Sequence, residues 1–168
     1  MHRVLLLVAL SFSFAFTGCQ TGKRGGAGGG GGADSDYVTG TPLPDRQEGL
    51  SFLSPNVDRG QFSPVYFAYD SFQVGPGEQG KIDQVASFLQ SSQATIIIAG
   101  FTDDRGTEEY NRGLGERRAL SVREALIQAG ADAGALQTVS FGEEMPADTG
   151  SGDSAWAKNR RAEFGVPR

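Results

Sequence analysis

Residues 95–126, TIIIAGFTDDRGTEEYNRGLGERRALSVREAL, contain the pattern on which the fold depends. The first six residues, TIIIAG, are mainly β-branched and apolar, which is typical of a central strand that is buried on both faces of a sheet. The stretch from Thr107 to about Ala129 carries apolar side chains at the 3.6-residue spacing of a helix. Gly130 is a suitable stop for that helix. The expected inner stripe of the helix consists of Leu114, Val122, Ala125, Leu126 and Ala129.

Comparable patterns on either side of this unit complete one domain. Residues 65–69, 138–142 and 161–166 predict three further strands, and residues 78–90 predict a second helix. A strand–helix–strand order favours a parallel pair of strands joined by a crossover. We therefore predict a two-layer α+β fold of order β-α-β-α-β-β over residues 62–168, with a mixed sheet and helices packed on one face. The positions expected to face inward are Ile82, Val85, Ala86 and Leu89 on the second helix, and Ala162, Phe164 and Val166 on the last strand.

The N-terminus has the pattern of an export signal. An apolar run over residues 4–16 is too short for a spanning helix, which needs about 20 residues. Residues 16–19, FTGC, resemble a bacterial lipobox, although Phe16 stands where leucine is usual. The resemblance implies lipidation of Cys19 and an outer-membrane anchor, whereas an ordinary cleaved signal would leave a free thiol. We expect a signal peptide at 1–18, a flexible Gly/Pro-rich tether at 19–61 and a following domain that faces the periplasm.

Composition argues against several classes of function. A net charge of −5 offers no attraction to nucleic acid. The only histidine is His2 and the only cysteine is Cys19, so the domain lacks residues for Ser-His-Asp or Cys-His catalysis and for an ordinary zinc site. A glycosidase and a calcium site are alternatives, but the acids near residue 105 lack the cleft geometry of the first and the EF-hand spacing of the second. We expect neither an enzyme nor a cofactor. The acids concerned are Asp103, Asp104, Glu108 and Glu109.

One arginine of the long helix is expected to face the core. Leu114, Arg118 and Val122 are four residues apart, so Arg118 falls on the apolar stripe while Arg117 turns toward solvent. Asp103 lies just beyond the buried strand, where ligand groups gather in sheets with parallel strands. A structural ion pair between Asp103 and Arg118 is one interpretation of this pattern.

Two further residues favour a ligand site over a single ion pair. Asn111 lies on the same helical face as Arg118, and Arg160 has the parity of the inward positions on the last strand. One acid, two arginines and an amide suit a ligand with both an ammonium and a carboxylate, because a guanidinium binds a carboxylate through two hydrogen bonds and an aspartate accepts from an ammonium. We therefore expect a pocket for a zwitterion.

Three motifs, in order, resemble the OmpA-like peptidoglycan-binding domain family, most closely its peptidoglycan-associated lipoprotein (Pal) type. They are TDxxG at residues 102–106, YNxxLxxRRAxxV at 110–122 and NRRxxF at 159–164. The resemblance covers about residues 62–168, although Phe101 stands where Pal-type members often have histidine. It implies an OmpA-like fold and non-catalytic binding of the diaminopimelate in a peptidoglycan stem peptide, which would tie the outer membrane to the cell wall.

The resemblance also implies roles for individual residues. Asp103 would take the ligand's amine and Arg118 its carboxylate, and Thr102 would offer its backbone. A TolB-like protein is implied as a partner, so an envelope scaffold that acts through proteins is the alternative function. The complete expected binding set is Asp103, Arg118, Asn111, Arg160, Leu114, Thr102 and Asp70.

Overall fold

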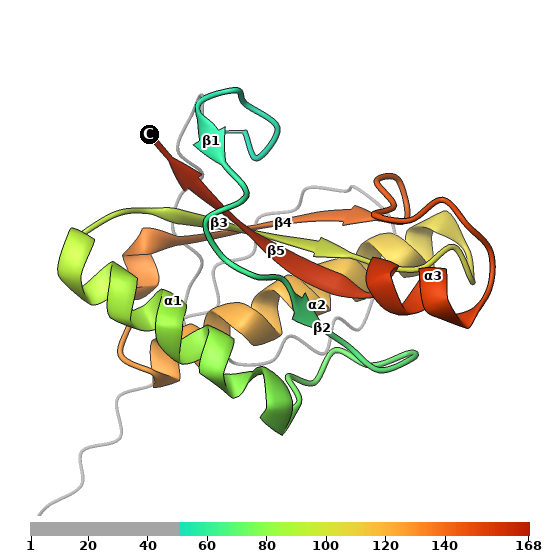
Figure 1. The fold of residues 1–168 in the computed structure, drawn as a ribbon, viewed down its shortest axis with the longest axis horizontal. Helices are drawn as coiled ribbons and strands as arrows, with labels where there is room; N and C mark the ends of the chain where they lie inside the picture. The colour runs from blue at the N-terminus through green and yellow to red at the C-terminus, as the bar shows by residue number, and fades with distance from the viewer. Residues whose placement is uncertain (1–50) are drawn as a thin grey trace, which may run out of the picture. The chain divides into compact units, whose positions relative to one another are not determined.

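The fold is described from a computed structural model, which describes residues 51–168 (Figure 1). The expected signal peptide, Cys19 and most of the expected tether lie outside the described residues. The elements are β1 (Val57–Asp58), β2 (Val65–Tyr66), the 3-10 helix η1 (Pro76–Glu78), α1 (Gln79–Ser92), β3 (Ile96–Phe101), α2 (Glu108–Gln128), the 3-10 helix η2 (Ala133–Ala135), β4 (Leu136–Gly142), α3 (Asp153–Asn159) and β5 (Arg161–Pro167).

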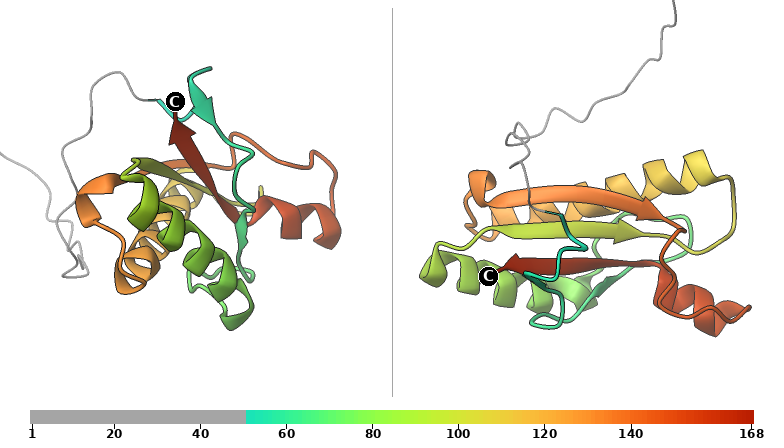
Figure 2. Two further views of the ribbon diagram at one scale, coloured as in Figure 1. Left: turned by 60° about the vertical axis from the view of Figure 1, so that its left-hand side comes forward. Right: turned by 90° about the horizontal axis from the view of Figure 1, so that it is seen from above.

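The last strand occupies the middle of the sheet, as Figure 2 shows. The strand order is β1-β5-β3-β4, and β2 also pairs with β5. β3 and β4 are parallel neighbours joined by α2, whereas β5 is antiparallel to β1, β2 and β3. The predicted mixed sheet is therefore confirmed. The crossover through α1 differs from the prediction, because β2 and β3 run in the same direction but have β5 between them.

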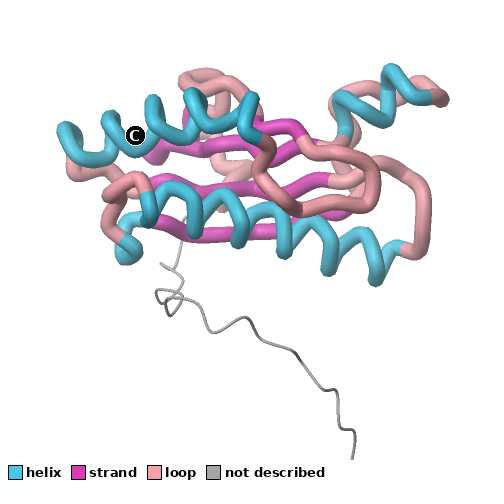
Figure 3. Tube along the Cα trace, turned by 90° about the horizontal axis from the view of Figure 1, so that it is seen from below, coloured by secondary structure: helices cyan, strands magenta, loops and turns pink. Residues whose placement is uncertain are grey.

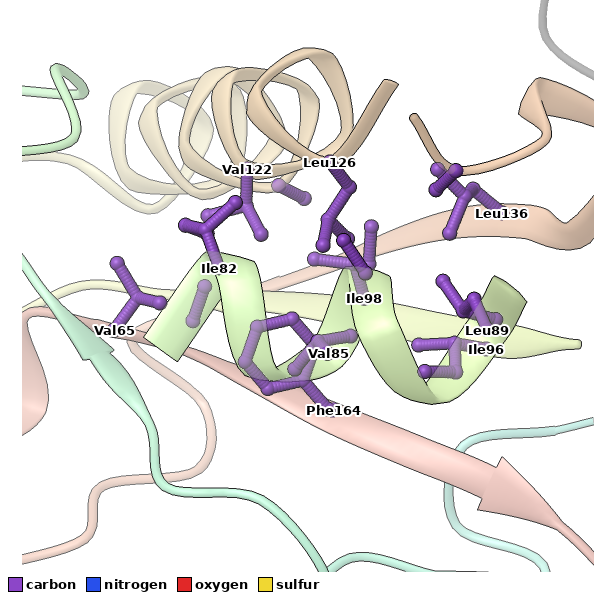
Figure 4. Close-up of a cluster of buried hydrophobic side chains, with 14 of the residues drawn as sticks. Val65, Ile82, Val85, Leu89, Ile96, Ile98, Val122, Leu126, Leu136 and Phe164 are labelled. Atoms are coloured by element: carbon purple, nitrogen blue, oxygen red, sulfur yellow. The ribbon is translucent and has the colours of Figure 1, made fainter. Parts of the chain in front are cut away.

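The two predicted helices cover one face of the sheet, as expected. Figure 3 shows α1 and α2 side by side over the strands, with α3 beyond one end of the sheet. All four positions predicted to be buried on α1 are buried, and all six residues of β3 are buried as well. This face forms the larger core, which contains the residues labelled in Figure 4: Val65, Ile82, Val85, Leu89, Ile96, Ile98, Val122, Leu126, Leu136 and Phe164.

The other face of the sheet is covered by residues that we expected in the tether. Phe52 is 3% exposed and Val57 is 7% exposed, and both pack against Ile97, Ala99 and Phe101 of β3. β1 also adds a short edge strand, with Val57 opposite Pro167 of β5. These contacts bury apolar surface that an extended chain would expose to water. The folded part of the chain therefore begins before Phe62.

Helix α2 lies unusually close to β3 near the carboxyl end of the strand. A Cβ atom on Gly100 would lie 1.9 Å from the carbonyl oxygen of Gly115, and one on Gly115 would lie 2.4 Å from Ser140 Oγ. Ser140 Oγ also donates to the carbonyl oxygen of Arg112 at 2.6 Å, which ties α2 to β4. Two glycines thus allow the contact that places the first half of α2 against the sheet.

Helix α2 begins and ends within one residue of the bounds that the sequence predicts. The Thr107 hydroxyl caps the first turn by accepting from the N–H of Tyr110 at 3.2 Å. Gly130 has a φ of 95° and ends the helix, with the N–H of Ala131 donating to the carbonyl of Leu126 at 2.9 Å. Along the predicted stripe Leu114, Val122 and Leu126 are buried, while Ala125 and Ala129 are half-buried.

Two further elements differ from the prediction. The first long strand, predicted at 65–69, pairs only over Val65–Tyr66, because the chain then turns away and reaches a φ of 51° at Asp70. The helix α3 was not predicted, because only Ala155 and Asn159 of its seven residues are buried and no apolar periodicity marks it.

Within residues 51–168, no helix is long and apolar enough to cross a membrane.

Candidate functional site: charged groups at the carboxyl end of β3

Arg118 is the most buried charged residue of the site. It lies on the same face of α2 as Leu114 and Val122, which confirms the predicted inward direction, and its side chain is 0% exposed. Its Nη1 donates to the carbonyl oxygen of Phe101 at 2.8 Å and its Nε donates to that of Ser71 at 2.8 Å. Nη2 lies 3.4 Å from the carbonyl oxygen of Ala68. The guanidinium therefore joins α2, the end of β3 and the loop after β2.

Arg118 has backbone acceptors but no carboxylate partner. Within residues 51–168, no carboxylate oxygen lies within 4.0 Å of its guanidinium. Burial lowers the pKa of Arg118 to about 10, although the negative charge of Asp103 acts in the opposite direction. Arg118 is thus charged at neutral pH.

Asp103 pairs with two arginines other than Arg118. The residue is 4% exposed, and its Oδ2 accepts from Arg105 Nη2 at 2.6 Å and from Arg160 Nη1 at 3.3 Å. Burial alone would raise the pKa of Asp103, but hydrogen bonds from Arg105 and Arg160 outweigh it, and the pKa lies below its usual value. The ion pair between Asp103 and Arg118, which we considered as the structural alternative, is therefore not formed in this structure.

Arg160 reaches the site from the junction of α3 and β5. Its Nε donates to the carbonyl oxygen of Phe67 at 3.0 Å, while the N–H of Phe67 donates to the carbonyl of Arg160 at 3.0 Å. The sequence predicted only that Arg160 points to the inner side of the sheet, and in the structure its side chain lies beside Asp103. Arg160 is the C-terminal cap of α3 and lies just before β5, so the alternation of strand residues that we used to predict its direction does not apply to it.

Asn111 and Thr102 each carry an unpartnered polar atom at the site. Asn111 is 1% exposed; its Nδ2 donates to Glu143 Oε2, whereas its Oδ1 is buried without a partner. The N–H of Thr102 already donates to the carbonyl of Gly142 at 2.8 Å, and its buried Oγ1 has no partner. The side chain of Thr102 thus has free hydrogen-bonding capacity, and the N–H of the backbone that we expected it to offer is already bonded.

Leu114 and Asp70 complete the expected set. Leu114 is 5% exposed and lies one turn before Arg118 on α2. Asp70 is exposed and accepts a hydrogen bond from the hydroxyl of Tyr110. The loop around Asp70 contributes two of the carbonyl groups that bind Arg118, so Asp70 lies beside the site and its side chain faces solvent.

Arg105 is a site residue that sequence reasoning missed. Its guanidinium carbon lies 4.0 Å from the ring centroid of Tyr69 and 4.1 Å from that of Trp156, while its Nη2 binds Asp103. Its place two residues after Asp103 was visible in the sequence. The rings of Tyr69 and Trp156 belong to segments far from Arg105 in the sequence, and no sequence pattern indicated that they contact it.

The acids near residue 105 do not gather around one point. Within residues 51–168, no three carboxylate, cysteine or histidine groups are arranged to hold a metal ion. A small pocket of about 140 Å³ does lie beside the site, and Thr102, Asp104, Glu143 and Asn159 are among the residues that line it. The side chains described at the site supply hydrogen-bonding groups and charge.

Comparison with known proteins gives one consistent result. The pattern of the OmpA family matches residues 66–160. A peptidoglycan-associated lipoprotein of Pseudomonas putida is 35% identical over 159 residues, which cover 94% of this chain and 92% of that protein.

Solved structures agree with the sequence relatives. The crystal structure of the peptidoglycan-associated lipoprotein from Burkholderia pseudomallei is similar with a TM-score of 0.60 and 42% identity, covering 61% of this chain and 88% of that one. The C-terminal domain of Helicobacter pylori MotB is similar with a TM-score of 0.57 and 26% identity, covering 61% and 82%. From its motifs, its fold and these relatives, the chain belongs to the OmpA family, among proteins related to the peptidoglycan-associated lipoproteins.

Proposed function

We propose that the domain binds peptidoglycan without covalent chemistry, through the free ammonium and carboxylate of diaminopimelate in a stem peptide. The observation that carries the proposal is the buried guanidinium of Arg118, which has three backbone carbonyls around it and no carboxylate partner within residues 51–168. A buried charge without a counterion is costly to maintain, so a ligand carboxylate at this point would be favourable. Arg118 offers a planar fork for that group.

Asp103 supplies the opposite charge for the same ligand. Its pKa lies below the usual value, so the carboxylate is ionised at neutral pH and can accept from an ammonium. Two side-chain atoms nearby, Asn111 Oδ1 and Thr102 Oγ1, are buried without partners and can accept further hydrogen bonds. The relatives named peptidoglycan-associated lipoproteins support peptidoglycan as the source of this ligand.

The second half of the proposal concerns the anchor. We propose that Cys19 is lipidated and holds the chain in the outer membrane, so that the protein links that membrane to the cell wall. The FTGC sequence and the names of the relatives support this arrangement. Binding at both ends within one compartment raises the local concentration of each partner, so a modest affinity at the pocket suffices.

The binding proposal is tested with two peptides that differ in one group. The full-length chain in detergent is titrated with a tripeptide that ends in diaminopimelate and with its lysine counterpart, which lacks the side-chain carboxylate. We expect at least a tenfold weaker affinity for the lysine peptide, because loss of a charge-assisted pair costs about 1.5–3 kcal/mol. Equal affinities would overturn the assignment of Arg118.

Variants of the site test the same proposal in sacculi. Asp103→Ala and Arg118→Gln should abolish co-sedimentation with purified sacculi while the chain stays folded by circular dichroism. Loss of folding in both would instead favour a purely structural role for these charges. Sacculi incubated with the wild-type chain should release no muropeptides, and release would favour a wall-cleaving enzyme.

The anchor is tested separately. Cys19→Ser should move the chain from the membrane fraction to the soluble periplasmic fraction, because stable anchoring depends on the attached acyl chains. Unchanged membrane fractionation would contradict lipidation at Cys19.

A TolB-like protein partner is a second candidate, which an exposed aromatic surface favours. Tyr69, Phe72 and Tyr110 are 62%, 39% and 45% exposed, and such residues are enriched at protein interfaces. We propose that this surface takes the partner. Phe72→Ser should then reduce co-purification of a TolB-like protein and leave sacculus binding unchanged, whereas the reverse result would assign Phe72 to the wall site.

A further inference from the structure

Asp103, the residue proposed to take the ligand's ammonium, already has two cationic partners within the chain. Its Oδ2 lies 2.6 Å from Arg105 Nη2 and 3.3 Å from Arg160 Nη1, and its Oδ1 accepts from the N–H of Arg105 at 3.3 Å. An incoming ammonium needs the same carboxylate. At least one of the two arginines must therefore give up its contact, or the cations must share the carboxylate at close range.

The two arginines are held very differently. Arg160 is fixed by backbone groups, because its Nε donates to the carbonyl of Phe67 and its own carbonyl accepts from the N–H of that residue. Arg105 has no such bonds: its Nε is buried without a partner, and its guanidinium lies between the rings of Tyr69 and Trp156. The Arg105 side chain is also more exposed, at 29% against 15%. Arg105 is thus the partner that can leave.

The balance of charge makes its departure depend on the ligand. Arg105 and Arg160 both pair with Asp103, and Arg118 adds a third positive charge close enough to interact with the same carboxylate. A simple amine adds a fourth positive charge and offers no anion in return. A zwitterion places its ammonium at Asp103 and adds a carboxylate for the guanidinium groups, so the total charge is unchanged.

We propose that Arg105 is an internal competitor for the ammonium position at Asp103, and that it makes the site selective for amino-acid head groups over simple amines. This inference rests on the proposed function of the same site. Arg105 is a specificity-determining residue in this arrangement, since a cation that binds Asp103 displaces Arg105 from its stacked and paired position or shares the carboxylate with it. The aromatic rings keep it close by, so the competition is intramolecular and persists at every ligand concentration.

The test compares two ligands on three versions of the full-length chain in detergent. Wild type, Arg105→Gln and the matched control Arg112→Gln are titrated calorimetrically with the diaminopimelate tripeptide and its lysine counterpart. Arg112→Gln removes the same positive charge as Arg105→Gln, but the side chain of Arg112 is 55% exposed and pairs with Glu144 on the surface. Thermal unfolding of each variant verifies that the fold is retained.

Removal of the competitor should help the lysine peptide most. We expect its affinity for Arg105→Gln to rise about three- to fivefold, the range for loss of a partly exposed ion pair. The affinity for the diaminopimelate peptide should change less than about twofold, so the preference between the ligands falls. Arg112→Gln should leave both affinities at the wild-type value.

Each other outcome counts against the inference in a recognisable way. A weaker diaminopimelate affinity in Arg105→Gln would mean that Arg105 grips the ligand, and unchanged affinities for both peptides would mean that it does not compete. If the wild-type chain binds neither peptide, the proposed function itself is wrong and this inference with it.

Fluorescence of Trp156, the only tryptophan of the chain, provides a measurement of Arg105 displacement that is independent of the titrations. Trp156 contacts the Arg105 guanidinium, so departure of Arg105 should change the tryptophan emission when wild type is saturated with the diaminopimelate peptide. The change should be absent in Arg105→Gln. An identical change in both chains would show that the ligand, and not Arg105, alters the emission.

Discussion

Gly115→Ala tests the close contact between α2 and β3 that positions Arg118 and Asn111. An alanine methyl at this position would lie 2.4 Å from Ser140 Oγ and 3.0 Å from the carbonyl oxygen of Gly100. The hydroxyl of Ser140 must move, which breaks its bond to the carbonyl of Arg112, or the helix must move away from the sheet. Either response changes the packing at the carboxyl end of β3.

The size of the effect follows from three contributions. Overpacking of this kind costs about 1–3 kcal/mol, and loss of the Ser140 hydrogen bond costs about 1 kcal/mol. Alanine is favoured over glycine inside a helix by about 1 kcal/mol, which offsets the second term. The free energy of unfolding should therefore fall by about 1–3 kcal/mol.

Gly113 provides a matched control on the same helix. A Cβ atom at Gly113 would meet no atom within 4 Å, so only the helix preference acts and Gly113→Ala should stabilise the chain by about 0.5–1 kcal/mol. Urea denaturation followed by circular dichroism measures both variants, and Gly115→Ala should also weaken binding of the diaminopimelate peptide. A Gly115→Ala chain at least as stable as wild type would refute the packing argument.

Three further predictions test other parts of the molecule. Phe52→Ala should lower the free energy of unfolding by about 3–5 kcal/mol, because it leaves a cavity at a buried site. The control Leu53→Ala, at a side chain that is 47% exposed, should change it by less than about 0.5 kcal/mol. Comparable effects of the two substitutions would contradict the packing of this segment. The folded pKa of Asp103 lies below 3.8, so the stability contributed by its ionised form is fully present above that pH and is lost as the pH falls through the folded pKa. Co-sedimentation with sacculi should therefore be unchanged from pH 7 to pH 5. A loss of co-sedimentation with a midpoint above pH 5 would exclude Asp103 as the titrating group. Arg118→Lys keeps the charge but not the planar fork, so the diaminopimelate affinity should fall at least about tenfold in calorimetry, and a wild-type affinity would show that charge alone suffices.

Local periodicity predicted the parts of the fold that depend on neighbouring residues. The 3.6-residue spacing identified every buried position of α1 and placed Arg118 between Leu114 and Val122, because the direction of a side chain on a helix is fixed by residue number alone. The unbroken apolar run of β3 predicted burial on both faces for the same reason. Gly130 was predicted as a helix end because few other residues tolerate its positive φ.

Contacts between distant segments were not predictable in this way. β5 lies between β3 and the N-terminal strands because of how strand edges pair in three dimensions. The alternation of Ala162 and Phe164 shows only which face of the strand is buried, and it would be the same whichever strands lay beside β5. Phe52 and Val57 lie among turn-forming residues. Their spacing follows neither the helical nor the strand periodicity, so the sequence did not predict that they are buried. Arg105 was missed because Tyr69 and Trp156, which hold it, lie far from it in the sequence.

The central position of β5 also affects how the sheet is completed during folding. Until residues 161–167 are in place, β1 and β2 have no partner in the sheet and β3 pairs only with β4. The missing pairings join segments that lie far apart in the sequence, so the chain must close long loops before these contacts stabilise it. The pairing of β5 is therefore the step that completes the sheet, and folding should be slower than in a domain built mainly from local contacts.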